Sequence, residues 1–78
     1  MKIIIAGSGC AKCKATEEVV RSVCAEAGLA AQIEHVYDIK EIARLGVFLT
    51  PAILIDGSLK MSGKAPTSQE VKKLLGIG

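Results

Sequence analysis

The sequence predicts an α/β fold in which a mixed four-stranded sheet is flanked by helices, with the element order βαβαββα. Two observations carry this prediction. Short apolar runs alternate with helical patterns over the first half of the chain, and an apolar run followed by Asp56-Gly57 indicates a β-hairpin before a last helix. Because a helix joins the first two strands, these should be parallel with a right-handed crossover, whereas the hairpin strands are antiparallel.

The first strand is expected over Lys2 to Ala6, a short isoleucine-rich run followed by the loop Gly7-Ser8-Gly9. A helical pattern then extends from Ala11 to Ala27, and Gly28 supplies its C-terminal stop. The apolar face of this helix is predicted to hold Thr16, Val19, Val20, Val23 and Ala27, and the polar face Glu17, Glu18, Arg21, Ser22 and Glu26.

Weak alternation from Ala31 to Tyr37 suits a second strand, with Ile33 and His35 on one side. Next, Asp38-Ile39-Lys40-Glu41 has the pattern of a capping box and should open a short helix that ends at Gly46.

The third strand is predicted over Ala52 to Ile55, and Ser58 to Ser62 forms the return strand of the hairpin. A second capping box, Thr67-Ser68-Gln69-Glu70, should open the last helix, which continues through Leu75. Its apolar side is expected to consist of Val71, Leu74 and Leu75.

Length and composition restrict the classes of protein to consider. The 78 residues form one small domain, 1–78, and half of them are hydrophobic, which favours a folded core. A net charge of +2 with scattered cations argues against nucleic acid as a partner. No apolar run is long enough for a membrane span or a secretory signal, so a cytoplasmic protein is expected. No exposed apolar patch is apparent in the sequence, so a monomer is expected.

The most informative motif is the pair Cys10 and Cys13, which stands between the first strand and the first helix. A helix N-terminus favours a thiolate, and the thiolate is the form that attacks disulfides and binds metals. The chain has three cysteines, an odd number, which argues against a scaffold of structural disulfides. The leading hypothesis is therefore a reversible dithiol–disulfide couple.

Strand, Cys-x-x-Cys, helix, and then Thr-Pro before a third strand and a hairpin resemble the thioredoxin fold. More narrowly, the chain resembles the small thioredoxin-like or glutaredoxin-like redox-active disulfide proteins of archaea and bacteria. The resemblance covers nearly the whole chain and implies a minimal thioredoxin fold. The matching residues are Gly9-Cys10-Ala11-Lys12-Cys13, Asp38 with Glu41-Ile42-Ala43, Gly46-Val47, Thr50-Pro51-Ala52 and Ile55-Asp56-Gly57.

This resemblance implies a thiol–disulfide oxidoreductase. Cys10 would be the attacking thiolate and Cys13 the resolving thiol. Pro51 would be cis and packed near the cysteines, and the backbone of Thr50 would pair with the substrate. Lys12, which stands between the cysteines, is counted with these two as a substrate-binding residue. Its charge or that of Lys14 would lower the pKa of Cys10, unless both side chains point into solvent. No bound cofactor is expected, because the electrons reside in the thiols. The partners would be a disulfide in a protein or small molecule and an upstream disulfide reductase.

One departure from the family pattern concerns the group that assists proton transfer. Many thioredoxins carry a buried carboxylate six residues before the first cysteine, where it assists proton transfer. This chain has Ile4 at that position, so the resemblance assigns no side chain to the task.

Several alternatives stay open on sequence grounds. Cys10 and Cys13 would also suit a non-catalytic module that binds or carries a soft metal or metalloid, although two thiolates leave a zinc site short of ligands. Pro51 would also suit an ordinary trans proline that opens an edge strand. His35 is interpreted as a surface or edge residue.

Cys24 has a separate interpretation. It follows Cys13 by eleven residues in one helix, which is a rise of about 16 Å. A disulfide requires Cα atoms within about 7 Å, so Cys24 is expected to be a small core residue.

Overall fold

Strand β1 (Lys2–Ala6) lies inside a four-stranded sheet in the computed structural model, which describes residues 1–9 and 11–76. The strand order is β2-β1-β3-β4, with β2 over Gln32–Val36, β3 over Ala52–Ile55 and β4 over Ser58–Ser62. Strand β1 is parallel to β2 and antiparallel to β3, and β3 is antiparallel to β4. The predicted mixed sheet and element order are therefore confirmed.

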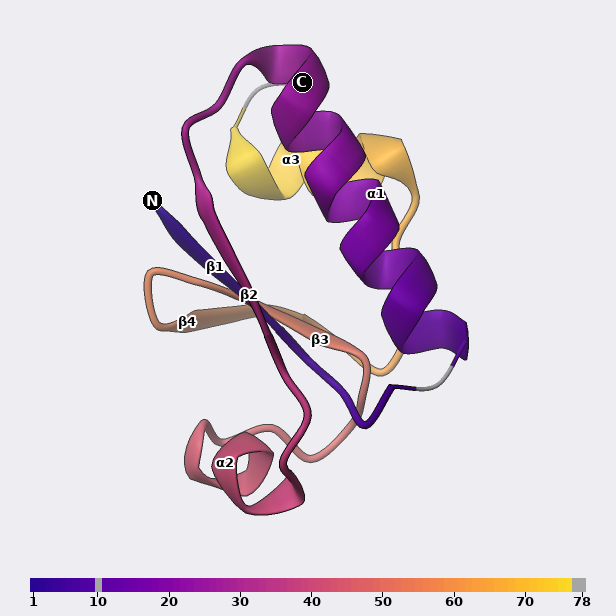
Figure 1. The fold of residues 1–78 in the computed structure, drawn as a ribbon, viewed down its shortest axis with the longest axis vertical. Helices are drawn as coiled ribbons and strands as arrows, with labels where there is room; N and C mark the ends of the chain where they lie inside the picture. The colour runs from indigo at the N-terminus through magenta and orange to yellow at the C-terminus, as the bar shows by residue number, and fades with distance from the viewer. Residues whose placement is uncertain (10, 77–78) are drawn as a thin grey trace.

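The three helices cover both faces of the sheet (Figure 1). Helices α1 (Ala11–Ala27) and α3 (Ser68–Leu75) lie together on one face, and α2 (Ile39–Arg44) lies on the other. Each face has its own buried cluster because successive strand residues point to opposite sides. Ile3 and Ile5 pack with residues of α1 and α3, whereas Ala6 packs with Ile42 of α2.

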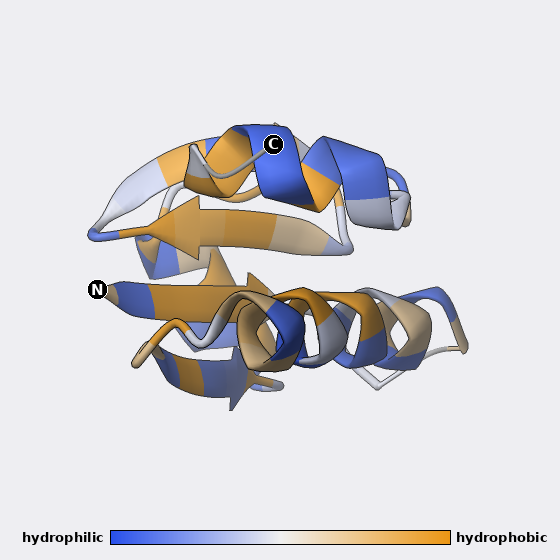
Figure 2. Cartoon of the chain, turned by 90° about the horizontal axis from the view of Figure 1, so that it is seen from above, coloured by the Kyte–Doolittle hydropathy of each residue, from blue (hydrophilic) through white to orange (hydrophobic). Residues whose placement is uncertain are grey.

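Burial follows hydropathy closely. Figure 2 shows β1 coloured as hydrophobic along most of its length, while α3 has both hydrophobic and hydrophilic sides. On α1 the buried residues are Cys13, Thr16, Val20, Val23 and Cys24. Thr16 is tolerated there because its hydroxyl donates to the carbonyl oxygen of Lys12 at 2.7 Å. Ala27 is exposed, contrary to the prediction, because it is the last residue of the helix.

The turns and caps follow the predicted chemistry in most places. Asp56 and Gly57 both have positive φ, 48° and 86°, as a tight two-residue hairpin turn requires. Thr67 and Glu70 form the predicted capping box of α3. The box predicted for α2 is only half formed. Asp38 accepts from the backbone N–H of Lys40 at 2.8 Å, but the Glu41 carboxylate turns to Arg44 instead.

Within the described ranges, no helix has both the length and the apolar character needed to cross a membrane.

Candidate functional site

The candidate site lies at the end of the sheet where β1 ends and β3 begins. Ala6 pairs with Ala52, so the loop after β1 and the loop before β3 leave the sheet at the same end. Cys13 stands in the first turn of α1 and is fully buried, whereas Lys12 beside it is exposed. Cys10, the first cysteine of the motif, lies outside the described residues.

The Thr50–Pro51 segment is held at this end by the last residues of β4 and the turn after it. The Thr50–Pro51 peptide bond is cis, Pro51 is buried and Thr50 is exposed. The carbonyl oxygen of Pro51 accepts from the N–H of Gly63 at 2.9 Å, and that of Leu49 accepts from the Ser62 hydroxyl at 2.8 Å. Strand β3, which Pro51 precedes, is a central strand and not an edge strand.

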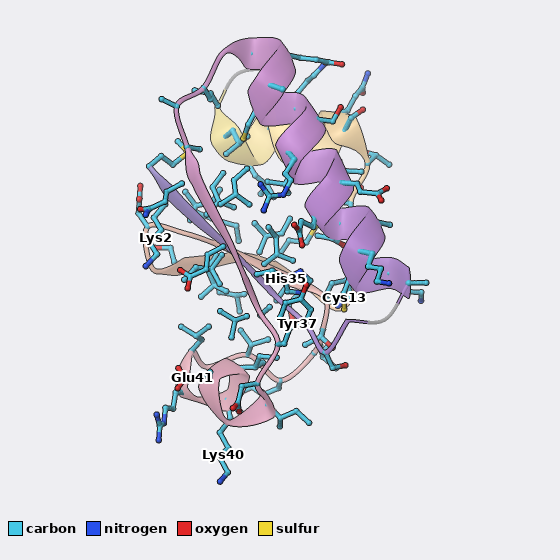
Figure 3. All side chains as sticks on the ribbon, viewed as in Figure 1. Lys2, Cys13, His35, Tyr37, Lys40 and Glu41 are labelled. Carbon is cyan, nitrogen blue, oxygen red and sulfur yellow. The ribbon has the colours of Figure 1, made fainter. Side chains whose placement is uncertain are left out.

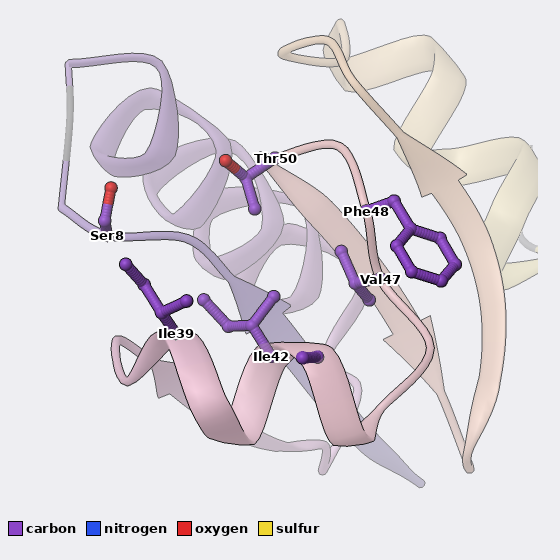
Figure 4. Close-up of a pocket in the computed structure, with 7 residues that line it drawn as sticks. Ser8, Ile39, Ile42, Val47, Phe48 and Thr50 are labelled. Atoms are coloured by element: carbon purple, nitrogen blue, oxygen red, sulfur yellow. The ribbon is translucent and has the colours of Figure 1, made fainter.

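A pocket of about 310 Å³ opens beside Thr50, between α2 and the two loops. In Figure 4 the side chains of Ile39 and Ile42 rise from α2 on one side of this space, and Ser8 and Thr50 lie on the loops across from them. Ile39 is 74% exposed and Phe48, which also lines the pocket, is 90% exposed. The rim of this pocket therefore carries exposed apolar side chains, which the sequence analysis did not single out.

Gly7 brings Cys13 and His35 together. A Cβ atom at Gly7 would collide with Cys13 Sγ, would lie 3.0 Å from Cys13 Cβ, and would lie 4.0 Å from His35 Nε2. Both side chains therefore converge on the same glycine, and Figure 3 shows them near the start of α1 with Tyr37 alongside. Because Gly7 has no side chain, Cys13 and His35 can both approach the backbone directly after β1.

His35 is the feature that sequence reasoning misjudged. Strand β2 is an edge strand, as one part of the interpretation held, but the imidazole is only 4% exposed and is not a surface group. Its Nδ1 lies 2.5 Å from Glu17 Oε1, its Nε2 lies 3.2 Å from the carbonyl oxygen of Gly7, and its ring stacks on Tyr37 with centroids 4.0 Å apart.

Glu17 is the second residue of this buried contact. Its hydrogen bond with His35, and a second one with Arg21, lower the pKa of the Glu17 carboxyl below its ordinary value. Glu17 was expected on the polar face of α1, and its side chain is only 23% exposed because the imidazole covers it. The available sequence signal was that Glu17 stands four residues, one helical turn, after Cys13.

Cys24 is separate from this site. It is 4% exposed and packs in the cluster between the sheet, α1 and α3, as predicted. Burial raises the pKa of the Cys24 thiol, which disfavours the reactive thiolate. Among the described residues no group of three His, Cys, Asp or Glu side chains is arranged to hold a metal ion.

The minimal sheet with α1 and α3 on one face, the buried cysteine in the first turn of α1 and the cis Thr50–Pro51 bond at the same end of the sheet define a protein of the thioredoxin class. The chain belongs to the thioredoxin domain family, whose model matches residues 1–76.

Two curated relatives carry the name thioredoxin. The chain is 36% identical over 75 residues to a thioredoxin of Methanothermobacter thermautotrophicus, covering 96% of this chain and 97% of that protein. It is 41% identical over 73 residues to a thioredoxin of Methanocaldococcus jannaschii, covering 94% of this chain and 84% of that protein. Membership of this family supports a thiol–disulfide oxidoreductase type of function.

Proposed function

We propose that this chain reduces disulfides through a Cys10–Cys13 dithiol–disulfide couple. The observation that carries the proposal is the burial of Cys13 in the first turn of α1, at the end of the sheet that also carries the cis Thr50–Pro51 bond, in a chain of the thioredoxin domain family. A buried second cysteine suits the resolving role, because the substrate then meets Cys10 first.

The reaction has two exchange steps. The Cys10 thiolate attacks one sulfur of the substrate disulfide, a mixed disulfide forms, and the first substrate thiolate departs. Cys13 then loses its proton and attacks the Cys10 sulfur. The Cys10–Cys13 bond forms, the bond to the substrate breaks, and the second substrate thiolate departs. Two electrons pass from the dithiol to the substrate, and its two sulfurs take up two protons.

The surroundings suggest how each group takes part. Helix α1 begins directly after Cys10 in the chain, so the unpaired N–H groups of its first turn favour a thiolate there. The exposed Thr50 offers its backbone to an extended substrate segment, Pro51 forms the wall behind it, and Lys12 adds a cation at the rim. The apolar pocket beside Thr50 receives the side chains of that segment.

The couple requires no resident cofactor, because the thiols themselves carry the electrons. It does require an upstream disulfide reductase to return the Cys10–Cys13 pair to the dithiol after each turnover. We assign the activity to the cytoplasm, where dithiols are kept reduced, since an odd number of cysteines is unsuited to a scaffold of structural disulfides.

Single cysteine variants test the mechanism. With a coloured small-molecule disulfide as substrate, Cys10→Ser should abolish turnover. Cys13→Ser should trap the mixed disulfide, visible as a mass increase of one substrate thiol. Cys24→Ser is the matched control and should react like the parent chain. Full disulfide reductase activity in the Cys10→Ser protein would refute the mechanism.

A measurement of metal content distinguishes the alternative module. The parent chain, purified under reducing conditions, should contain no stoichiometric metal and should form an intramolecular disulfide in graded dithiol buffers. A metal ion held by Cys10 and Cys13 in a chain that reduces no disulfide would instead favour a soft-metal or metalloid carrier.

A further inference from the structure

Both hydrogen-bond partners of His35 are oxygen atoms. A carbonyl oxygen and a carboxylate oxygen can only accept hydrogen bonds. Nε2 faces the carbonyl oxygen of Gly7 at 3.2 Å and Nδ1 faces the Glu17 carboxylate at 2.5 Å, so each ring nitrogen has an acceptor opposite it. The form of the ring that can donate to both acceptors at once is the imidazolium. The lowered pKa of the Glu17 carboxyl agrees with an ion pair at this position.

The imidazole and Cys13 approach the same glycine, Gly7. The Cys13 side chain and His35 Nε2 both lie within 4.0 Å of the one point where a Gly7 Cβ would stand. Glu17 sits at the other ring nitrogen, and Arg21 binds the second oxygen of that carboxylate at 2.8 Å. Among the described residues, the titratable groups that contact the ring are thus Glu17 and Tyr37, with Cys13 across Gly7.

We propose that His35 is a positioning residue for the second exchange step: its imidazolium, held by Glu17 and the Gly7 carbonyl, stabilises the thiolate of the buried Cys13. The proposal rests on the proposed function for its role in turnover. A buried thiolate is costly unless hydrogen bonds or a positive charge accompany it. Ile4 cannot supply a charge and packs with the cluster under α2, on the other face of the sheet from α1.

The proton and electron balance of the step is simple. The Cys13 S–H proton passes to water, the thiolate attacks the Cys10 sulfur of the mixed disulfide, and the departing substrate thiolate takes a proton from water. His35 keeps its proton throughout and contributes charge. The contacts of His35 also stabilise the fold, because they join β2 to Glu17 of α1 and to Gly7 at the end of β1.

The first experiment measures Cys13 without any turnover. In a Cys10→Ser, Cys24→Ala background, Cys13 is the only cysteine, and the ultraviolet absorbance of its thiolate is followed against pH. His35→Gln keeps an N–H donor but removes the charge, and should raise the pKa of Cys13 by about one unit, a tenfold loss of thiolate at a given pH. Glu34→Gln on the same strand is the matched control and should leave the titration unchanged.

The second experiment reports on the ring itself. His35 is the only histidine of the chain, so its ring nitrogens give one unambiguous set of NMR signals in the unsubstituted chain. These should show a ring protonated on both nitrogens at neutral pH. Glu17→Gln should shift the signals towards the neutral ring, whereas Glu18→Gln, an exposed neighbour on the same helix, should not.

Kinetics connect the two measurements to turnover. His35→Gln should leave the attack of Cys10 unchanged, prolong the life of the mixed disulfide about tenfold at neutral pH, and approach parental rates in alkali, where Cys13 ionises unaided. An unchanged Cys13 titration in folded His35→Gln protein, or a neutral ring in the native chain, would overturn the inference. The proposed function fails separately, if Cys13→Ser traps no mixed disulfide.

Discussion

At the scale of single residues, Gly7 carries the tightest steric demand of the site. We predict that Gly7→Ala destabilises the protein by about 1–3 kcal/mol, because the added methyl group meets Cys13 Sγ and forces α1 or the β1 end to shift. Urea unfolding measures the loss. Ser8→Ala, at the exposed neighbouring position, should change the free energy of unfolding by less than about 0.5 kcal/mol. Equal stability of Gly7→Ala and the parent would show that Cys13 has room to move.

The Glu17 carboxyl makes the stability of the folded protein depend on pH. Its pKa is lower in the folded state than the ordinary value of 4.5, chiefly through the bond to His35 and then through Arg21. The folded state therefore binds this proton less readily than the unfolded state. The contribution to stability is present above pH 4.5 and is lost as the pH falls through the lower folded pKa.

The corresponding prediction concerns the acid limb of the stability curve. Glu17→Gln should lower the free energy of unfolding by about 1–2 kcal/mol at neutral pH and should flatten its decline below pH 4.5. Urea unfolding across that range, with Glu18→Gln as control, checks both effects. A Glu17→Gln curve parallel to that of the parent would contradict the ion pair.

At the scale of secondary-structure elements, α3 depends on its N-terminal cap. Thr67 Oγ1 accepts from the N–H of Glu70 at 3.2 Å, and the Glu70 carboxylate accepts from the N–H of Thr67 at 3.0 Å. We predict that Thr67→Ala costs about 1 kcal/mol. The control is Ser68→Ala, the exposed first residue of the helix, which should be nearly neutral. Thermal unfolding of the two variants decides the matter, and equal melting temperatures would show that the cap contributes nothing.

Elements were predictable from the sequence because their signals are local. The hairpin at Asp56-Gly57, the Gly28 stop and the strand β3 each depend on residues within a few positions, and the structure places all three as predicted. The contacts of His35 were not predictable in the same way. Its partners Glu17 and Gly7 are 18 and 28 residues away in the chain, so only the parallel register of β1 and β2 and the path of α1 bring them together.

At the scale of the whole molecule, the two ends of the sheet differ, because one is closed by the hairpin and the other carries the candidate site. One end is closed by the hairpin, where the N–H of Lys2 donates to Asp56 Oδ1 at 2.9 Å and its carbonyl oxygen accepts from the N–H of Asp56 at 2.8 Å. The other end gathers Gly7, Cys13, His35 and the Thr50–Pro51 segment. This arrangement lets the site expose apolar side chains without loosening the core, because the two buried clusters lie on the faces of the sheet.

The apolar surface at this second end supports a last prediction about partners, which rests on the proposed function. Phe48 is 90% exposed and lines the pocket beside Thr50, so it contributes little to the core. Phe48→Ser should leave the free energy of unfolding within about 0.5 kcal/mol of the parent. It should lower kcat/KM for a protein disulfide about tenfold, the loss expected for one aromatic contact.

The matched control is Leu59→Ser, which removes a 45% exposed apolar side chain near the hairpin, at the opposite end of the sheet. It should leave kcat/KM unchanged. A small coloured disulfide, too short to reach Phe48, should be reduced at the parental rate by both variants. If Phe48→Ser and Leu59→Ser reduce the protein disulfide equally well, protein substrates do not dock on this surface, and the exposure of Phe48 requires another explanation.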